Sequence, residues 1–310
     1  MRTVFIINPL AGNGNSMKKW QRFKKNISFP FEEFVTQYAG HAIQIASSFE
    51  SLQEEILLIG FGGDGTLREI IAGAAGNPKV IVGSVAAGSG NDFSRSFQSF
   101  RSGQEIKRFL QEPTAKPQDL GELRDETRFK FVSSSGIGFD AEVSFLVNES
   151  LAKVWLNRFR AGKLVYLLYV IKTLIKFERF DLQVEHDGKT LCYQDVWLAT
   201  ISNQPYFGGG MAISPDSKTD DGLLELTVVH GISRKKLLYV FRTVFKGTHM
   251  RFREVAHMSG KEFGLVTDRV VYRHVDGDYA GKTIEGKKVD YFISEKHWKS
   301  IIYNRKRMQK

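Results

Sequence analysis

Apolar runs alternate with amphipathic stretches over the first third of the chain. The runs cover residues 3–7, 56–61 and 79–85, and each is followed by a glycine-containing loop and then by a helix-like stretch. Runs of this length suit strands that are buried on both faces of a parallel sheet. Because the carboxyl ends of parallel strands meet at one edge of a sheet, the three loops are predicted to lie together there, where open α/β sheets bind ligands.

The helices expected after these loops begin at about Met17, at Thr66, and at Asn91 or Asp92. The stretch from Thr66 to Glu69 has the spacing of a capping box, in which a hydroxyl and a carboxylate satisfy free backbone N–H groups. The first third therefore predicts an α/β domain, with Thr66 and Glu69 at the start of one of its helices.

Beyond Pro113 and Pro117 the pattern changes to short alternating segments that are typical of antiparallel strands. An Asp187-Gly188 turn predicts a hairpin, and two helices interrupt the strands, the second of them capped by Ser233. The sequence predicts a β-rich second domain, a sandwich. The strands are expected at 129–133, 182–186, 189–193, 196–201 and 224–229, and the helices at about 162–177 and 233–246.

Composition agrees with two globular domains, because 310 residues exceed the size at which one core usually stops growing. An excess of 44 Lys and Arg over 34 Asp and Glu gives a net charge of +10, which favours anionic partners: a nucleotide, a phospholipid surface or nucleic acid. Charge alone does not choose among them. The single cysteine, Cys192, excludes an internal disulfide, and we expect it to be buried in a hairpin strand.

No signal peptide is apparent, and the longest apolar segment, 164–175, contains Lys172 and falls short of the roughly twenty residues that a membrane span needs. We therefore expect a soluble, cytoplasmic protein. Residues 153–164 mix basic and large apolar side chains. This mixture suits either a segment that rests on an anionic bilayer or a core helix with a solvated basic face.

Two glycine-rich stretches carry the strongest chemical signal, residues 62–66 and 88–93. Glycine lets backbone N–H groups approach an anion, and a helix N-terminus adds partial positive charge. Both stretches therefore predict a phosphate cradle. Neither has the P-loop spacing, and neither gives the Gly-x-Gly-x-x-Gly dinucleotide fingerprint in its proper context, so the nucleotide site must be of another kind.

In order and spacing, six motifs resemble those of the diacylglycerol kinase catalytic family, the lipid kinases that include soluble bacterial diacylglycerol kinases and sphingosine kinases. The resemblance covers nearly the whole chain, although Gly-Gly-Asp-Gly is shared with NAD kinases and phosphofructokinases. It implies a nucleotide-binding domain like theirs, ATP and Mg²⁺ as cofactors, and a lipid acceptor. The motifs are Asn8-Pro9-x-Ala11-Gly12, Thr36 with Gly40-His41-Ala42, Gly62-Gly63-Asp64-Gly65-Thr66, Gly88-Ser89-Gly90-Asn91-Asp92-Phe93-x-Arg95, Pro215 to Leu223, and Val275-Asp276-Gly277-Asp278.

For the nucleotide, we expect glycine amides to hold the phosphates, Thr66 and Ser89 to donate hydroxyls, and Asn91 to face the nucleotide. Asp64 is expected to organise the metal and the triphosphate, with an Asx-turn stabilised by its own side chain as the alternative. The expected nucleotide-binding residues are Asn8, Pro9, Ala11, Gly12, Thr36, Gly62, Gly63, Asp64, Gly65, Thr66, Gly88, Ser89, Asn91 and Asp92.

The general base is expected at Asp276 or Asp278. The family carries Glu at the second of these positions, and the shorter side chain of Asp278 favours Asp276 as the base with Asp278 in support. Alone, the motif would equally fit a tight hairpin turn around Gly277.

The loop from Asp216 to Leu223 is rich in oxygen donors, as a hard cation requires. The resemblance implies a structural magnesium held by the Asp221 side chain and the backbone carbonyls of Lys218 and Leu223. Asp216 or Asp220 could contribute through water. The alternative is an Asp-Gly turn that leads into the strand at Leu224.

These inferences predict an ATP-binding domain over residues 1–118 and a lipid-substrate domain over 119–290. The family resemblance adds that residues from about 291 to 310 pack back on the first domain. The function predicted is an ATP-dependent lipid kinase, peripheral at the inner membrane surface, acting on diacylglycerol or a related lipid alcohol. A homodimer is compatible with the sequence, and no nucleic-acid partner is expected. The alternatives are a soluble small-molecule kinase of the NAD kinase type and a non-catalytic member that binds an anionic membrane.

Overall fold

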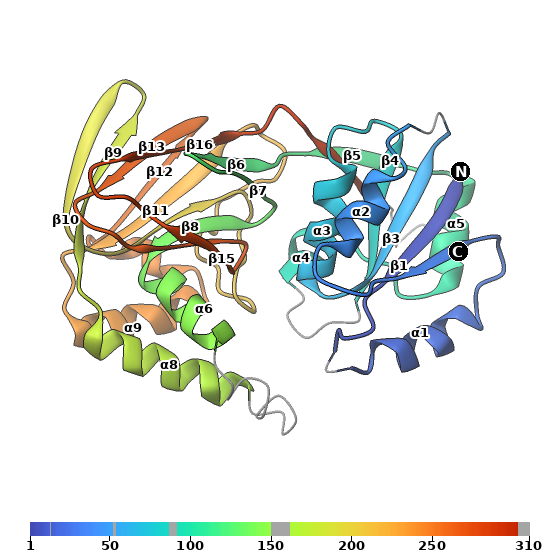
Figure 1. Ribbon diagram of the computed structural model, residues 1–310, viewed down its shortest axis with the longest axis horizontal. Helices are drawn as coiled ribbons and strands as arrows, with labels where there is room; N and C mark the ends of the chain where they lie inside the picture. The colour runs from blue at the N-terminus through green and yellow to red at the C-terminus, as the bar shows by residue number, and fades with distance from the viewer. Residues whose placement is uncertain (13, 52–53, 87–91, 150–161, 303–310) are drawn as a thin grey trace. The chain divides into compact units, whose positions relative to one another are not determined.

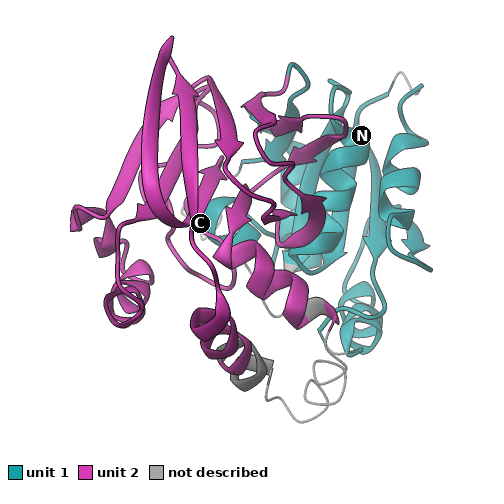
Figure 2. Ribbon diagram, turned by 60° about the vertical axis from the view of Figure 1, so that its left-hand side comes forward, with its two compact units in different colours: residues 1–119, 295–310 teal, residues 120–294 magenta. Residues whose placement is uncertain are grey.

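The computed structural model describes residues 1–12, 14–51, 54–86, 92–149 and 162–302. The chain divides into two compact units, Met1–Asp119 with Glu295–Lys310 and Leu120–Ser294 (Figure 2). The boundaries expected from the sequence are 118/119 and about 290/291. Within the described residues, no helix is long and apolar enough to cross a membrane.

Unit 1 is built on a six-stranded sheet of order β2-β1-β3-β4-β17-β5, in which β2, β1, β3 and β4 run parallel (Figure 1). The loops after β1, β3 and β4 therefore leave the same edge of the sheet. The strands are β1 Arg2–Ile7, β2 Glu32–Val35, β3 Ile56–Gly62, β4 Val80–Ala86, β5 Ala115–Gln118 and β17 Trp298–Ile301, and the helices are α1 Ser16–Lys24, α2 His41–Ser47, α3 Asp64–Ala74, α4 Asp92–Ser96 and α5 Gly103–Gln111.

The three strands expected from the apolar runs form the centre of this sheet, and every residue of β3 is buried. One face packs on an aromatic cluster in which the Trp20 ring lies 4.8 Å from that of Phe5 and 5.3 Å from that of Phe61. Gly60 lets α3 approach β3 closely, because a Cβ there would lie 2.4 Å from Leu67 Cδ2. The central strands thereby pack closely against α3 and the aromatic cluster.

Strand β17 comes from the far end of the chain. It pairs parallel to β4 at Ser300 and Val82 and antiparallel to β5, and Gln118 Nε2 donates to Ser300 Oγ at 3.0 Å. Trp298 is 2 % exposed and packs on Phe93, in α4, and on Phe97, directly after α4. Unit 1 therefore depends on residues that lie almost two hundred positions apart along the chain.

Unit 2 is an antiparallel sandwich whose strands follow the order β15-β14-β8-β10-β9-β13-β16-β6-β7, with β11 joining β10 and β12. Helices α8 and α9 pack on it through residues such as Leu174 and Leu237, which share a core with Trp197. The strands are β6 Gly121–Arg124, β7 Arg128–Phe131, β8 Ser134–Gly138, β9 Phe180–His186, β10 Lys189–Ser202, β11 Leu224–His230, β12 Val255–Gly260, β13 Glu262–Thr267, β14 Tyr272–Val275, β15 Asp278–Lys282 and β16 Lys288–Ile293; the helices are α6 Phe139–Glu149, α8 Gly162–Lys176, α9 Arg234–Val244 and the 3₁₀ turn Thr248–Arg251.

Strand β10 corrects two expectations. The segments expected separately at 189–193 and 196–201 are one strand with a bulge between Tyr193 and Val196, where Asp195 has φ 55°. The first half extends beyond the core as a hairpin with β9, so Cys192 is exposed and the prediction that it is buried was wrong. Ser233 does cap α9, since its side chain accepts from the Lys236 amide.

Candidate active site

The loops after β1 and β3 line one pocket in unit 1, with a volume of about 800 Å³. The pocket gathers nine of the residues expected to bind nucleotide, together with Leu10, Gln37, Tyr38, Ala39 and Glu69, which the sequence analysis did not assign to the nucleotide site. The nine are Asn8, Pro9, Ala11, Gly12, Thr36, Gly63, Asp64, Gly65 and Thr66.

The two loops are joined by side chains. Asn8 Nδ2 donates to Thr66 Oγ1 at 3.0 Å, while Asn8 Oδ1 accepts from the Leu10 amide at 2.9 Å. Gly62 makes room for this contact, because a Cβ there would lie 2.6 Å from Thr66 Oγ1. The asparagine and threonine thus hold the backbone of both loops in place around the pocket.

The expected capping box at Thr66 and Glu69 is wrong. Helix α3 already begins at Asp64, with Gly63 at its N-cap, so Thr66 is inside the first turn. The Glu69 carboxylate instead accepts from the amides of Gly40 and Ala42 at 3.0 and 3.2 Å. It caps the N-terminus of the neighbouring helix α2, a long-range contact that short sequence spacing cannot reveal.

Asp64 joins the β3 loop to the segment after β4. Its carboxylate accepts from the amides of Asp92 and Phe93 at 3.3 and 3.1 Å, which are the first residues of α4. Asp64 therefore acts as an acceptor for a helix N-terminus, a role that differs from the Asx-turn considered above. Of the second glycine-rich stretch, Gly88, Ser89 and Asn91 lie outside the described residues, and Asp92 is buried.

In unit 2, Asp276 and Gly277 form the two-residue turn between β14 and β15, with φ values of 51° and 87°. Both residues are left-handed, as a type I′ hairpin requires. The Asp276 carboxylate accepts from three backbone amides, those of Val132, Ser133 and Ser134, at 3.0, 2.7 and 3.0 Å. The motif is therefore both a tight turn and a precisely oriented acid, whereas Asp278 is exposed at the first position of β15.

A buried histidine holds this turn from within. His274 Nδ1 accepts from the Gly277 amide at 3.3 Å, so Nε2 carries the proton and donates to Asp140 Oδ2 at 3.0 Å. Thr200 Oγ1 donates to the same oxygen, and the Phe207 ring stacks on the imidazole at 4.9 Å. His274 and Asp140 were not among the site residues expected from the sequence. The sequence feature that could have identified His274 is its position two residues before Asp276, in the segment that forms β14.

The loop from Asp216 to Leu223 has donors that suit a hard cation. Asp221 is exposed, and one of its oxygens accepts from the Leu223 amide at 3.1 Å. Burial raises the pKa of Glu225, and the neighbouring Asp221 and Asp216 carboxylates add to this shift. Asp216 and Asp221 thus place negative charge at the loop that a cation would offset. Among the described residues, no three His, Cys, Asp or Glu side chains form a metal cluster, but the expected set consists mainly of backbone carbonyls.

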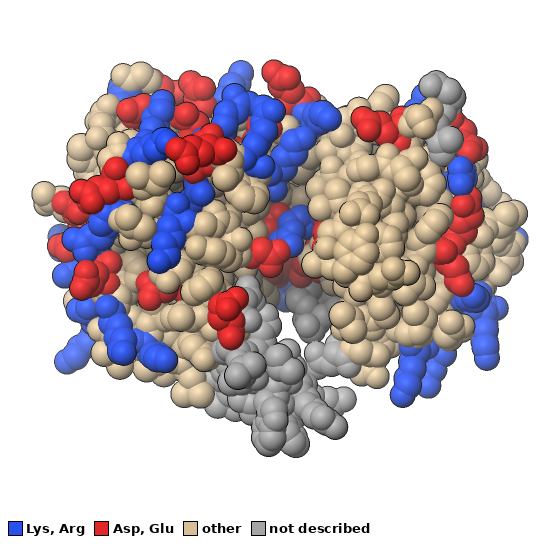
Figure 3. Space-filling view, viewed as in Figure 1, with Lys and Arg blue, Asp and Glu red and all other residues tan. Residues whose placement is uncertain are grey.

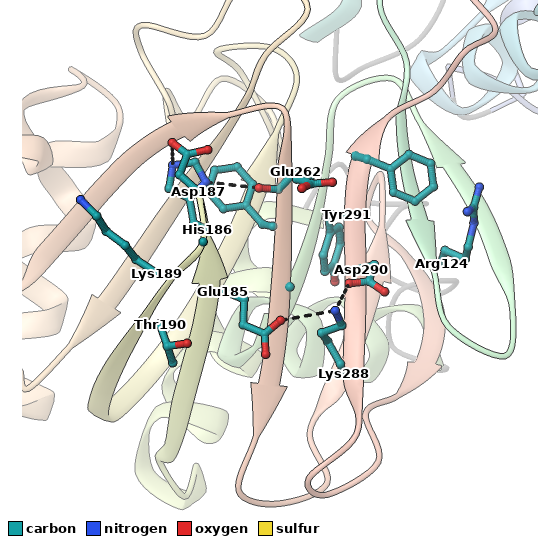
Figure 4. Close-up of a pocket in the computed structure, with 14 residues that line it drawn as sticks. Arg124, Glu185, His186, Asp187, Lys189, Thr190, Glu262, Lys288, Asp290 and Tyr291 are labelled. Atoms are coloured by element: carbon teal, nitrogen blue, oxygen red, sulfur yellow. Dashed lines mark hydrogen bonds and ion pairs between the residues drawn. The ribbon is translucent and has the colours of Figure 1, made fainter.

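A further hollow of about 610 Å³ lies on a sheet face of unit 2, beside β9, β13 and β16 (Figure 4). One of its cations is paired within the hollow: Lys288 Nζ lies 3.3 Å from a Glu185 oxygen and 3.2 Å from an Asp290 oxygen. None of the predicted site residues lines it.

Comparison with known proteins identifies the family. Residues 2–123 match the family model described as "Diacylglycerol kinase catalytic domain". Residues 133–289 match the model described as "YegS C-terminal NAD kinase beta sandwich-like domain". A Bacillus subtilis protein named "Putative lipid kinase YtlR" is 31% identical over 291 residues, covering 90% of this chain and 94% of the relative. The protein belongs to the diacylglycerol kinase family. Membership makes it a kinase, as the motifs predicted.

Other members and neighbours agree. A Mycobacterium tuberculosis protein named diacylglycerol kinase is 26% identical over 287 residues, covering 90% of this chain and 89% of that one. A solved Bacillus anthracis diacylglycerol kinase superposes with a TM-score of 0.68 at 19% identity, covering 98% and 97% of the two chains, and yeast NADH kinase with 0.54 at 12% identity, covering 98% and 84%. These likenesses confirm the predicted fold class.

Proposed function

We propose that the protein is an ATP-dependent lipid kinase, which transfers the γ-phosphate to a hydroxyl of diacylglycerol or a related lipid alcohol. The observation that carries the proposal is the unit 1 pocket, where nine residues predicted to bind nucleotide line one space at the carboxyl edge of a parallel sheet. The relatives named diacylglycerol kinase support the choice of acceptor.

In this proposal, the amides of Gly12, Gly63 and Gly65 bind the phosphates, and the N-terminus of α3 adds partial positive charge. The Asp216–Leu223 loop would hold magnesium through Asp221 and the carbonyls of Lys218 and Leu223. Magnesium, when bound, offsets negative charge. Asp276 takes the proton from the acceptor hydroxyl. The three backbone amides that it accepts from fix the orientation of its carboxylate.

An apolar pocket supports a lipid acceptor. It lies in unit 2 between α6, α8 and α9, and its lining is apolar apart from Asp140 and His249. Asp140 and Phe207 line it and also contact His274, which holds the Asp276 turn. The pocket has a volume of about 60 Å³, so it would admit only the end of a hydrocarbon chain, near the proposed base. We further propose that the protein works in the cytoplasm, peripherally at the inner membrane surface.

The test is transfer of radiolabelled γ-phosphate from ATP to a panel of lipids in mixed micelles with magnesium. We expect label in an organic-soluble product, and its loss in Asp64→Asn. Label only in water-soluble products would move the acceptor to a soluble molecule. ATP binding without any transfer would instead favour a non-catalytic role.

Tyr38 is expected to set nucleotide affinity. It lines the unit 1 pocket, its ring is 54% exposed, and one face already stacks on His41 at 4.7 Å. Its hydroxyl donates to Gln44 Oε1 at 2.8 Å, which fixes the ring and leaves the other face for a base. Stacking on an aromatic side chain contributes about 1–3 kcal/mol per base, so Tyr38→Ala should weaken ATP binding at least about fivefold.

Calorimetric titration with ATP and with tripolyphosphate measures this effect. Tyr38→Phe keeps the ring and should bind ATP like the native protein, and all three proteins should bind tripolyphosphate equally. Equal weakening for both ligands in Tyr38→Ala would mean that Tyr38 supports the phosphate loops and does not stack on the base.

A further inference from the structure

Helices α8 and α9 present apolar side chains to the surface of unit 2. Each helix buries one face, exemplified by Val170 and Leu174 on α8 and by Val240 and Val244 on α9. Their other faces, with the C-cap of α9, carry six of the ten large apolar side chains that are exposed in the described part of unit 2. These are Leu168, Ile171, Ile175, Leu238, Tyr239 and Phe245, which are 61, 42, 67, 42, 62 and 54% exposed.

The same surface is basic. Neither α8 nor α9 contains an Asp or Glu residue. Five exposed cations accompany the apolar side chains, and among the described residues none of the five forms an ion pair with a carboxylate. Figure 3 shows blue side chains gathered where α9 lies. The five are Lys172, Lys176, Lys235, Arg242 and Lys246.

The two helices form one continuous surface. The Arg234 guanidinium, at the start of α9, donates to the carbonyls of Leu174 and Phe177 at 3.0 and 3.1 Å, which pins it to the end of α8. Both helices also line the apolar pocket, which reaches the surface at Leu238. Figures 1 and 2 both show the helices on the same side of the sandwich.

We propose that this α8–α9 face docks on an anionic phospholipid bilayer. Exposed aliphatic and aromatic side chains enter the interfacial region, while lysines and arginines bind lipid phosphates. Exposed apolar surfaces of this kind mark sites of interaction with a partner or a membrane. A second copy of the same face would oppose like charges, whereas anionic headgroups complement them. The inference rests on the proposed function, because it states how the enzyme reaches a membrane-borne acceptor.

Sedimentation with phosphatidylcholine vesicles, with and without phosphatidylglycerol, tests the proposal. We expect the native protein to bind the anionic vesicles, less so at high salt. Two variants, Ile171→Ser/Ile175→Ser and Lys235→Gln/Arg242→Gln, should each lose about tenfold or more in vesicle affinity. The matched control is Leu191→Ser/Lys189→Gln in the β9–β10 hairpin, at the opposite end of unit 2 from the two helices (Figure 1), and it should bind like the native protein.

Two further readouts separate this proposal from the proposed function. All variants should phosphorylate a short-chain lipid that is dispersed as monomers, at the native rate. If none of the proteins shows that activity while the native protein still binds vesicles, the kinase proposal alone is overturned. Vesicle binding that none of the helix variants changes would overturn the docking face. A change of oligomeric state in those variants, with unchanged vesicle binding, would likewise overturn it and assign the face to self-association.

Discussion

Asp276→Asn is expected to lose about 100- to 10,000-fold in phosphate transfer, the range typical for removal of a general base. The same variant should also be less stable. Asp276 Oδ1 accepts from the amides of Ser133 and Ser134, and an asparagine carbonyl can keep both bonds. An asparagine Nδ2 in the place of Oδ2 would face the Val132 N–H, and leaving that donor unpaired costs about 1–3 kcal/mol. Asparagine tolerates the left-handed backbone, so no further strain is expected.

The matched variant is Asp278→Asn. Asp278 is exposed, so its replacement should leave denaturant unfolding unchanged and reduce transfer less than Asp276→Asn does. Activity is compared per folded molecule, with the folded fraction taken from denaturant curves. The assignment of the base to Asp276 fails if Asp278→Asn abolishes transfer while folded Asp276→Asn retains it.

Arg273→Met is expected to destabilise the protein by about 3–5 kcal/mol, the cost typical of removing one partner of a buried ion pair. The Arg273 side chain is 4% exposed and pairs with Asp125, which is 14% exposed. Asp125 Oδ1 also accepts from the amide and hydroxyl of Thr127, so it organises the turn between β6 and β7. Without the guanidinium, the partly buried Asp125 carboxylate would lie beside β14 without its cation.

The double variant Arg273→Met/Asp125→Asn serves as the control and should recover most of the lost stability, because no unpaired charge remains. Acid should narrow the difference between Arg273→Met and the native protein. Burial alone would raise the pKa of Asp125, but hydrogen bonds from Thr127 and Arg273 hold it below its ordinary value of 3.8. The pair's contribution is thus complete above that value and declines as pH falls through the lowered pKa. Equal unfolding curves for the native protein and Arg273→Met at neutral pH would contradict this account.

The central strands of unit 1 and the position of its nucleotide pocket could be predicted from sequence. Runs such as 56–61 must be buried on both faces, and the loops after parallel strands must share an edge. The hairpin around Asp187 and Gly188 was also predictable, since their φ values of 49° and 69° are those that the Asp-Gly pair favours. The strands and the hairpin follow from preferences of residues that are close in sequence, and the shared edge follows from the parallel order of the strands.

Local sequence does not reveal which side chains serve a distant element, and two expectations were wrong for that reason: the capping box at Glu69 and the burial of Cys192. Glu69 has the spacing of a local cap but caps α2, and Asp64 accepts from the start of α4. Cys192 has the apolar character of a core residue, yet its strand extends past the core. Nothing local to Trp298 indicates that it packs beside Phe97. In each case the deciding partner lies far along the chain.

By itself, the sequence determined the order of the functional motifs along the chain. Glycine-rich loops follow apolar strands in the first third, and an acidic turn follows in the β-rich second half. Backbone preferences and hydrophobic periodicity act over a few residues, so they can be read directly. Only the tertiary structure decided that three amides and His274 hold the acidic turn, and that α8 and α9 share a basic, apolar surface. Those arrangements depend on which distant backbone donors and helix faces packing brings together, and local sequence does not encode that information.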